Sequence, residues 1–347
     1  MVLKIPPVFP FLRRYIAIIL LFLLLVALAG FVAAQSFVNY SSPGDFSREI
    51  RPVFPAALFS GFLESQEARN AARPYWVPTE EESTAMPDSR PFESILLNND
   101  LLIYYGHPLS RNMGILGRHR PEVLKEMMVE LAAEYRAAGG KNIILGFYII
   151  YGTVWPGGEI GVISSSVLRE WLDFTLENDM LMFIDHQIGR FDPVEQFKTM
   201  LPYLRYPNVH LALDPEWRTQ RPMQEIGHLR ADEINEVQRI MEEYMIENNI
   251  PGERLLVIHQ FNRVMLRNRE NIRADFSKVR LVHCISGIGT PEMKRDTYAF
   301  GALAQNIPVK GFKLWYDLGI PGSVDRPLMT PREVLGLNPR PYIMMYQ

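Results

Sequence analysis

The sequence predicts an α/β domain of the (β/α)8 barrel type, preceded by an N-terminal membrane or signal helix. Eight short apolar runs follow one another between residues 95 and 347, and helical patterns separate most of them. Such alternation is typical of a parallel sheet with helical crossovers, and eight is the number of strands that closes a barrel. An open, doubly wound sheet is the competing architecture, although no glycine-rich phosphate loop follows the first run.

The predicted elements follow from apolar spacing and from residues that begin or end helices. The predicted strands cover residues 101–105, 143–150, 181–184, 209–213, 255–258, 279–282, 309–314 and 342–347. The predicted helices cover residues 121–138, 164–178, 192–204, 231–249, 291–306 and 331–337, with a less regular helical stretch at about 264–276. Proline or serine stands at several helix starts, and Gly139-Gly140 ends the first helix. The barrel is predicted to lack the helix that would follow its eighth strand.

The first 36 residues are expected to form a membrane anchor or a signal peptide. Lys4, Arg13 and Arg14 precede an uncharged apolar run from Tyr15 to Ala34, and about twenty apolar residues suffice to span a bilayer. The positive flank predicts that the remainder lies outside the cytoplasm. The small residues at the end of the run also suit a signal peptidase, so secretion after cleavage near Ala34 is the alternative.

Residues 37–94 are rich in proline, serine and charged side chains, which predicts a linker that partly wraps the barrel of residues 95–347. The formal net charge is −3 and no basic cluster appears, so a nucleic-acid partner is not expected. The single cysteine, Cys284, excludes an intramolecular disulfide. Composition predicts no cofactor and identifies no protein partner.

The fourth predicted strand ends in two acids, Asp214 and Glu216. Residues i and i+2 of a strand share a face, and Pro215 between them cannot donate to a sheet. Two acids at the exit of a buried strand are costly unless they are solvated, paired or used. Two interpretations follow: a structural one, in which the acids hold a loop or pair with a cation, and a functional one, in which they form the centre of an active site.

Polar and aromatic residues also follow the other strands, where barrel enzymes carry their catalytic groups. We expect substrate-binding roles for Tyr105, His107, Asp185, His186, Trp217, His259, Gln260, His283, Lys313, Trp315 and Tyr346. Each has a structural alternative, because buried histidines are often hydrogen-bonded core residues and aromatic side chains often only pack. The structural alternative for Lys313 is a buried counter-ion that keeps the acids ionised.

Glycoside hydrolysis is the chemistry that this residue set suggests. That reaction needs one carboxylic acid to protonate the leaving oxygen and a second group to stabilise or attack the sugar. Repulsion between nearby carboxylates raises one pKa and keeps that group protonated. Glu216 is the predicted acid, and Asp214 and Asp317 are its predicted partners.

Asp214-Pro215-Glu216 is similar to the Asp-x-Glu of chitinase-type glycoside hydrolases and of barrel-fold muramidases. His210 and Ala212 stand where the chitinase pattern has further acids. A broader resemblance covers most of residues 95–347 and rests on the segments 213–217, 258–261, 282–283 and 313–317. These segments resemble a family of secreted bacterial proteins, many of them lipoproteins, and the resemblance implies export and a barrel fold.

The expected function is therefore that of a membrane-tethered, glycoside-hydrolase-like barrel that acts on or binds cell-wall or extracellular glycan. A non-catalytic module is the first alternative, binding glycan or serving as a subunit of a membrane complex. A metal-dependent hydrolase is the second, with ligands drawn from His107, Asp185, His186, Asp214, His259 and His283. No His-x-His pair follows the first strand, so no metal site is predicted.

Overall fold

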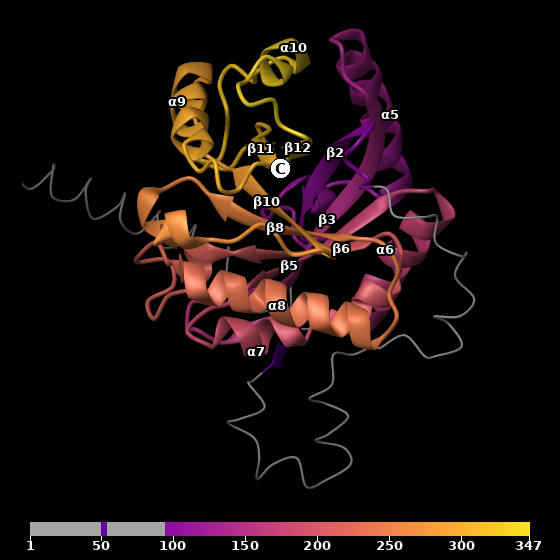
Figure 1. Cartoon of the computed structure of the whole chain (residues 1–347). Coiled ribbons are helices and arrows are strands. Elements are labelled where there is room, and N and C mark those ends of the chain that lie inside the picture. Colours follow the sequence, from indigo (N-terminus) through magenta and orange to yellow (C-terminus); the bar gives the residue numbers. More distant parts are fainter. Residues whose placement is uncertain (1–49, 54–93) are drawn as a thin grey trace, which may run out of the picture. The chain divides into compact units, whose positions relative to one another are not determined.

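In the computed structural model, which describes residues 50–53 and 94–347, eight parallel strands close into a barrel (Figure 1). The strands pair in the order β2-β3-β5-β6-β8-β10-β11-β12, and β12 pairs with β2 again. They cover Asn99–Gly106, Asn142–Val154, Leu181–Gln187, Val209–Asp214, Arg254–Gln260, Val279–Ile285, Lys310–Leu314 and Ile343–Tyr346. The prediction of a barrel is confirmed, and every predicted strand is present.

Helices connect most of these strands on the outside of the barrel (Figure 1). They are α5 (Pro121–Ala137), α6 (Ser165–Glu177), α7 (Pro193–Lys198), α8 (Ala231–Glu247), α9 (Pro291–Ala302) and α10 (Pro331–Leu335). Proline at the first helical position and a side-chain N-cap begin α7, α9 and α10, where Asp192, Thr290 and Thr330 accept hydrogen bonds from backbone N–H groups. Apart from α7, the positions of these helices predicted from the sequence are confirmed to within a few residues.

Two helix predictions are wrong in detail. The stretch 264–276 contains no α-helix but two 3-10 turns, η5 (Arg263–Met265) and η6 (Arg269–Asn271), around the short strand β9 (Leu266–Arg267). Asn268, with φ at 53°, adopts a left-handed conformation that a helix does not continue through. The helix predicted for 192–204 ends at Lys198 and gives way to η3 (Leu201–Arg205), because Pro202 has no N–H to donate to the carbonyl of Lys198.

A small antiparallel extension lies beside the barrel and was not predicted. Strand β3 continues past the barrel wall to Val154, and β4 (Ile160–Ile163) folds back along it. The backbone of β1 (Ile50–Val53) pairs antiparallel with β4. Strands β7 (Leu229–Arg230) and β9 form a separate parallel pair.

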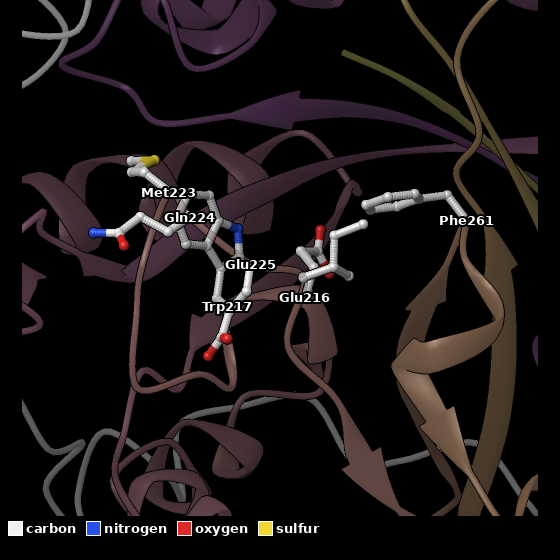
Figure 2. Close-up of a pocket in the computed structure, with 7 residues that line it drawn as sticks. Glu216, Trp217, Met223, Gln224, Glu225 and Phe261 are labelled. Atoms are coloured by element: carbon white, nitrogen blue, oxygen red, sulfur yellow. The ribbon is translucent and has the colours of Figure 1, made fainter.

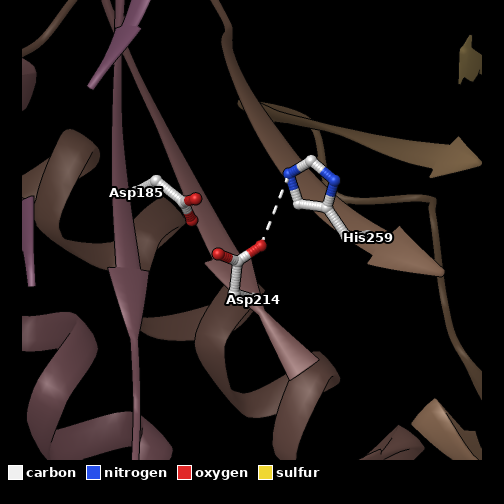
Figure 3. Close-up of side chains that lie close together, drawn as sticks. All are labelled: Asp185, Asp214 and His259. Carbon is white, nitrogen blue, oxygen red and sulfur yellow. Dashed lines mark ion pairs between the residues drawn. The ribbon is translucent and has the colours of Figure 1, made fainter. Parts of the chain in front are cut away.

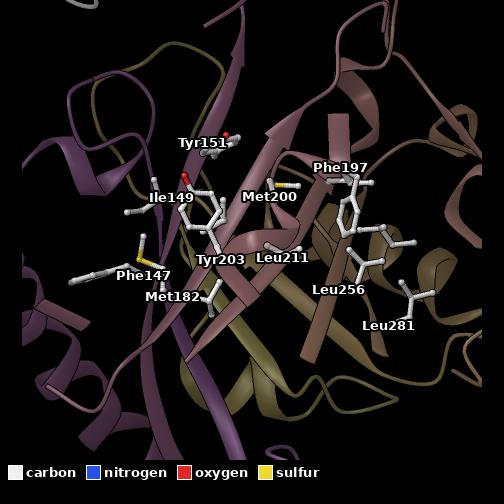
Figure 4. Packing of buried hydrophobic residues seen from close by; sticks show 14 of the residues in the cluster. Phe147, Ile149, Tyr151, Met182, Phe197, Met200, Tyr203, Leu211, Leu256 and Leu281 are labelled. Atoms are coloured by element: carbon white, nitrogen blue, oxygen red, sulfur yellow. The ribbon is translucent and has the colours of Figure 1, made fainter. Parts of the chain in front are cut away.

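Side chains alternate between two packing layers along each barrel strand. Residues such as Met182, Leu211 and Leu256 face outward and pack against the helices in one large apolar cluster (Figure 4). The residues between them face the barrel interior, where Asp185, Asp214 and His259 converge, and this alternation decides which strand-end groups can meet.

No helix among residues 50–53 and 94–347 is long and apolar enough to cross a membrane. The N-terminal helix predicted within residues 1–36 and most of the predicted linker lie outside the described residues.

Candidate functional site

Three buried side chains from neighbouring strands converge at the carboxyl end of the barrel (Figure 3). Asp185 lies near the end of β5, Asp214 ends β6 and His259 lies near the end of β8. One donor atom of each lies within 4.8 Å of the other two, and Nε2 of His259 is 3.6 Å from Oδ1 of Asp214. All three side chains are almost completely buried, so their charges must be compensated inside the barrel.

Two tyrosines on the adjacent strands β2 and β3 hydrogen-bond this group. The hydroxyl of Tyr105, on β2, donates to Oδ2 of Asp214 at 3.3 Å and to Oδ2 of Asp185 at 3.4 Å. The hydroxyl of Tyr148, on β3, lies 2.7 Å from Nε2 of His259. Tyr105 and Tyr148 are register partners, which places their rings 5.1 Å apart.

The two aspartates divide into a protonated and an ionised member. Burial raises the pKa of both carboxyls, and the negative charge of Asp214 raises the pKa of Asp185 further. A hydrogen bond between the two carboxyls raises the pKa of Asp185 and lowers that of Asp214. Asp185 therefore holds the proton and donates it to Asp214, which the Tyr105 hydroxyl also stabilises as an anion.

Lys313, on β11, supplies the positive charge of the mouth. Its Nζ lies 3.5 Å from the ring centroid of Tyr105 and 4.7 Å from that of Trp315. Burial lowers the pKa of Lys313, whereas the charges of Asp214 and Glu216 oppose that change. Burial and then the charge of Lys313 lower the pKa of His259 well below its ordinary value, so this imidazole is neutral.

Glu216 occupies the 3-10 turn η4 (Pro215–Trp217) directly after β6 and lines a pocket of about 340 Å³ (Figure 2). Its side chain is half-buried, and Oε2 is buried with no hydrogen-bond partner among the described residues. Burial, together with the charge of Asp214, raises the pKa of Glu216 to about 8. The carboxyl is therefore protonated at neutral pH and can act as an acid.

The rest of the pocket is largely apolar and aromatic. Trp217, Met223, Ile226 and Phe261 line it together with the polar Gln224 and Glu225. Figure 2 shows Trp217 and Phe261 on opposite sides of Glu216. Met223, Ile226 and Phe261 are exposed, each by 37–40%, which gives a ligand accessible apolar surface beside the acid.

Four predicted binding residues face the helices and do not reach the barrel mouth. Nδ1 of His186 bonds the carbonyl of Gln187, and its ring packs on Tyr151. Gln260 and His283 bond each other, and Nδ1 of His283 contacts Lys310. The hydroxyl of Tyr346 bonds that of Tyr135 on α5. All four lie one residue away from an inward-facing position.

Of three further predicted site residues, Asp317 lies at the surface, His107 is buried, and Trp315 lies at the barrel mouth. Asp317 is about half exposed, pairs with Arg326 and accepts from the N–H of Gly319, so it does not join the buried acids. His107 is buried, and Nδ1 accepts from the N–H of Leu109 at 3.1 Å. Trp315 does lie at the mouth, beside Lys313.

Two residues of the site were missed by sequence reasoning. Tyr148 lies in the middle of an apolar strand, where a tyrosine reads as ordinary core. Its only signal was a hydroxyl in a run of aliphatic side chains, on the face that also carries Ile150. Phe261 follows His259-Gln260 in a loop and contributes to the pocket only because η4 lies close to β8.

Asp185, Asp214 and His259 are also the one group of three in the described part of the chain whose donor atoms are close enough to share a metal ion. Oxygen and nitrogen donors of this kind suit a borderline divalent cation. The carboxyl–carboxyl hydrogen bond, the Tyr105 hydroxyl and the Lys313 ammonium already neutralise this cluster, which favours acid–base chemistry over metal binding.

Comparison with known proteins adds no function to this geometry. No protein-family model matches the sequence, and no curated protein matches it. Among solved structures, the chain is similar to oxaloacetate acetylhydrolase in complex with the product oxalate. The two share 14% identity over 71% of this chain and 75% of that chain, with a TM-score of 0.42. At that level of similarity neither reaction nor ligand transfers, and the barrel rests on the strand pairing itself.

Proposed function

We propose that the protein is a glycoside-hydrolase-like enzyme in which Glu216 protonates the leaving oxygen of a glycosidic bond. The observation that carries this proposal is a buried carboxyl oxygen of Glu216, at the wall of an accessible pocket, that has no hydrogen-bond partner within residues 94–347. An acid whose pKa lies near 8 is protonated at neutral pH yet close enough to that pH to give up its proton.

Asp214 is the proposed partner, as an anion that stabilises positive charge on the sugar ring. Its position two residues before Glu216 supports this role, as do its hydrogen bonds from Asp185 and Tyr105. Asp317 is withdrawn from the proposed catalytic set because Arg326 pairs with it at the surface. Trp217 and Phe261 offer ring faces to the apolar face of a sugar.

We further propose that the barrel works outside the cytoplasm on cell-wall or extracellular glycan, tethered by the apolar run from Tyr15 to Ala34. The support is the length of that run and the positive charges before it. A barrel that only binds glycan would use the same pocket, so turnover is what separates an enzyme from a binding module.

Glu216→Gln in the full chain tests the acid role against a panel of cell-wall and extracellular glycans. We expect turnover to fall by roughly 10²–10⁴-fold with glycan binding retained, because the amide keeps the shape but cannot donate the proton. Glu236→Gln, on the exposed face of α8, is the matched control. Equal turnover by Glu216→Gln and the wild type would refute the assignment.

The metal-dependent alternative has its own test at Asp185, Asp214 and His259. Metal analysis of protein purified without chelators should find well under one equivalent of any transition metal. A stoichiometric metal that is lost in Asp185→Asn would instead support metal-dependent hydrolysis.

A further inference from the structure

Three lysines bury their side chains in the described part of the fold: Lys294, Lys310 and Lys313. Burying an ammonium is costly unless acceptors replace the water that it loses. The three can therefore be compared by asking which acceptors each one has.

Two of these lysines are fully engaged by the protein. Nζ of Lys294 pairs with Oδ2 of Asp325 at 2.8 Å and donates to the carbonyl of Gly287 at 2.7 Å. Nζ of Lys310 donates to the carbonyl of Ala304 at 2.8 Å and to that of Gly301 at 3.3 Å. Both amines tie strand ends and helices together, and neither faces the barrel interior.

The side-chain amine of Lys313 makes no hydrogen bond and no ion pair within residues 94–347. Its amine lies over the rings of Tyr105 and Trp315, on the inner face of β11. The hydroxyl edge of the same Tyr105 bonds Asp214 and Asp185. Tyr105 thus contacts the Lys313 amine with its ring face and the two carboxyls with its hydroxyl. This arrangement suits a reactive amine better than a purely structural one.

We propose that Lys313 is a nucleophilic amine that forms an imine with a neutral carbonyl compound, an aldehyde or ketone, in the barrel mouth. The negative charge of Asp214 close to this amine disfavours an anionic carbonyl compound. This chemistry goes beyond glycoside hydrolysis, because the acid role of Glu216 does not require an amine nucleophile.

The reaction balances without an added oxidant or reductant. The lone pair of neutral Nζ attacks the carbonyl carbon, a C–N bond forms, and the oxygen takes up the proton that nitrogen releases. The resulting hydroxyl leaves as water after a second protonation, and the nitrogen lone pair forms the C=N bond. Asp185 carries a proton, and the Tyr105 hydroxyl bridges the two aspartates, so the acid that this departure needs is at hand. Burial lowers the pKa of Lys313, which increases the share of neutral amine.

The test uses the folded full chain, glycolaldehyde as a small neutral aldehyde, and cyanoborohydride to reduce any imine to a stable secondary amine. Peptide mapping by mass spectrometry then gives the modification rate of each lysine at pH 7. We expect Lys313 to react severalfold faster than the exposed Lys198, because burial lowers the pKa of Lys313 and so raises its fraction of neutral amine. Lys294 and Lys310, buried and fully bonded, should stay unmodified.

A rate at Lys313 equal to or below that at Lys198 would overturn the proposal. The measurement is made on wild-type protein, so it does not depend on a variant that folds. In denaturant the preference for Lys313 should vanish, which shows that the fold creates it. Because no glycan is present, this result and the hydrolysis test at Glu216 can fail separately.

Tyr105→Phe keeps the ring beneath the amine but removes the hydroxyl, and should slow labelling of Lys313 severalfold.

Discussion

The fold buries the carboxyl group of Glu216, the acid proposed for catalysis. A glutamate after a proline at a strand end is ordinarily solvated and ionised. Here burial and the neighbouring Asp214 raise its pKa to about 8, and one carboxyl oxygen has no partner among the described residues. The raised pKa of the proposed acid is thus a result of its burial near β6 and β8. Whether Glu216 is protonated should affect both the stability and the activity of the protein.

The first prediction concerns the pH dependence of stability at Glu216. The pKa is about 8 in the folded state and near 4.5 in the unfolded state, so the wild type loses stability as the pH rises from about 4.5 to 8. Glu216→Gln does not ionise. Its free energy of unfolding relative to the wild type should therefore rise between pH 5 and pH 8, by roughly 1–4 kcal/mol at about 1.4 kcal/mol per pKa unit.

Urea unfolding at both pH values measures this difference, with Glu236→Gln as an exposed control. The same relative stability at pH 5 and pH 8 would show that Glu216 titrates normally. Any hydrolytic activity of the wild type should fall as the pH rises through about 8, because the acid is then deprotonated.

The connections after β10 and β11 are held by one buried ion pair. Lys294, in α9, pairs with Asp325 in the segment between β11 and α10. Asp325 also accepts from the N–H groups of Gly289 and Trp315, so it joins both connections to the end of β11. The pair therefore positions Trp315, and with it the edge of the barrel mouth.

The second prediction is that Lys294→Met destabilises the fold by about 3–5 kcal/mol, because it leaves the Asp325 carboxylate buried without its cation. Arg295→Met, in the next residue of α9, breaks an exposed pair with Glu333 and should cost below about 1 kcal/mol. Chemical denaturation of the two variants measures the contrast. Losses of similar size in both would mean that the buried pair has no special role.

The barrel as a whole brings distant segments to one mouth. Tyr105 and Lys313 lie more than two hundred residues apart in the sequence, yet closure of β12 on β2 brings them into contact. Parallel strands with their carboxyl ends at one edge place every inward strand-end side chain there. The proposed enzyme therefore depends on complete closure of the eight strands.

The third prediction concerns the whole chain. The apolar run from Tyr15 to Ala34 should keep the full-length protein in the membrane fraction after carbonate extraction. Removal of residues 1–36 should release the protein into the soluble fraction. Recovery of the full-length protein in the soluble fraction, with an N-terminus near residue 35, would instead favour secretion after cleavage.

The sequence by itself determined the strand and helix alternation, the eightfold count and the neighbourhood of the site. Those features are local, since apolar period, helix caps and strand ends are set by residues close in the chain. Asp214, Glu216 and Asp185 could be selected in this way. The failed helix at residues 264–276 shows the limit, because apolar spacing alone did not reveal the turn at Asn268.

Only the tertiary structure decided which strand-end residues meet. A shift of one residue moves a side chain from the barrel interior to the helix layer, and this separates His259 from Gln260, and Asp185 from His186. Charge pairing is likewise a property of the assembled fold: Arg326 holds Asp317 at the surface, and Tyr105 links Asp214 to Lys313 across the mouth. Distances between strands, which the linear order of residues does not contain, set the protonation of the site.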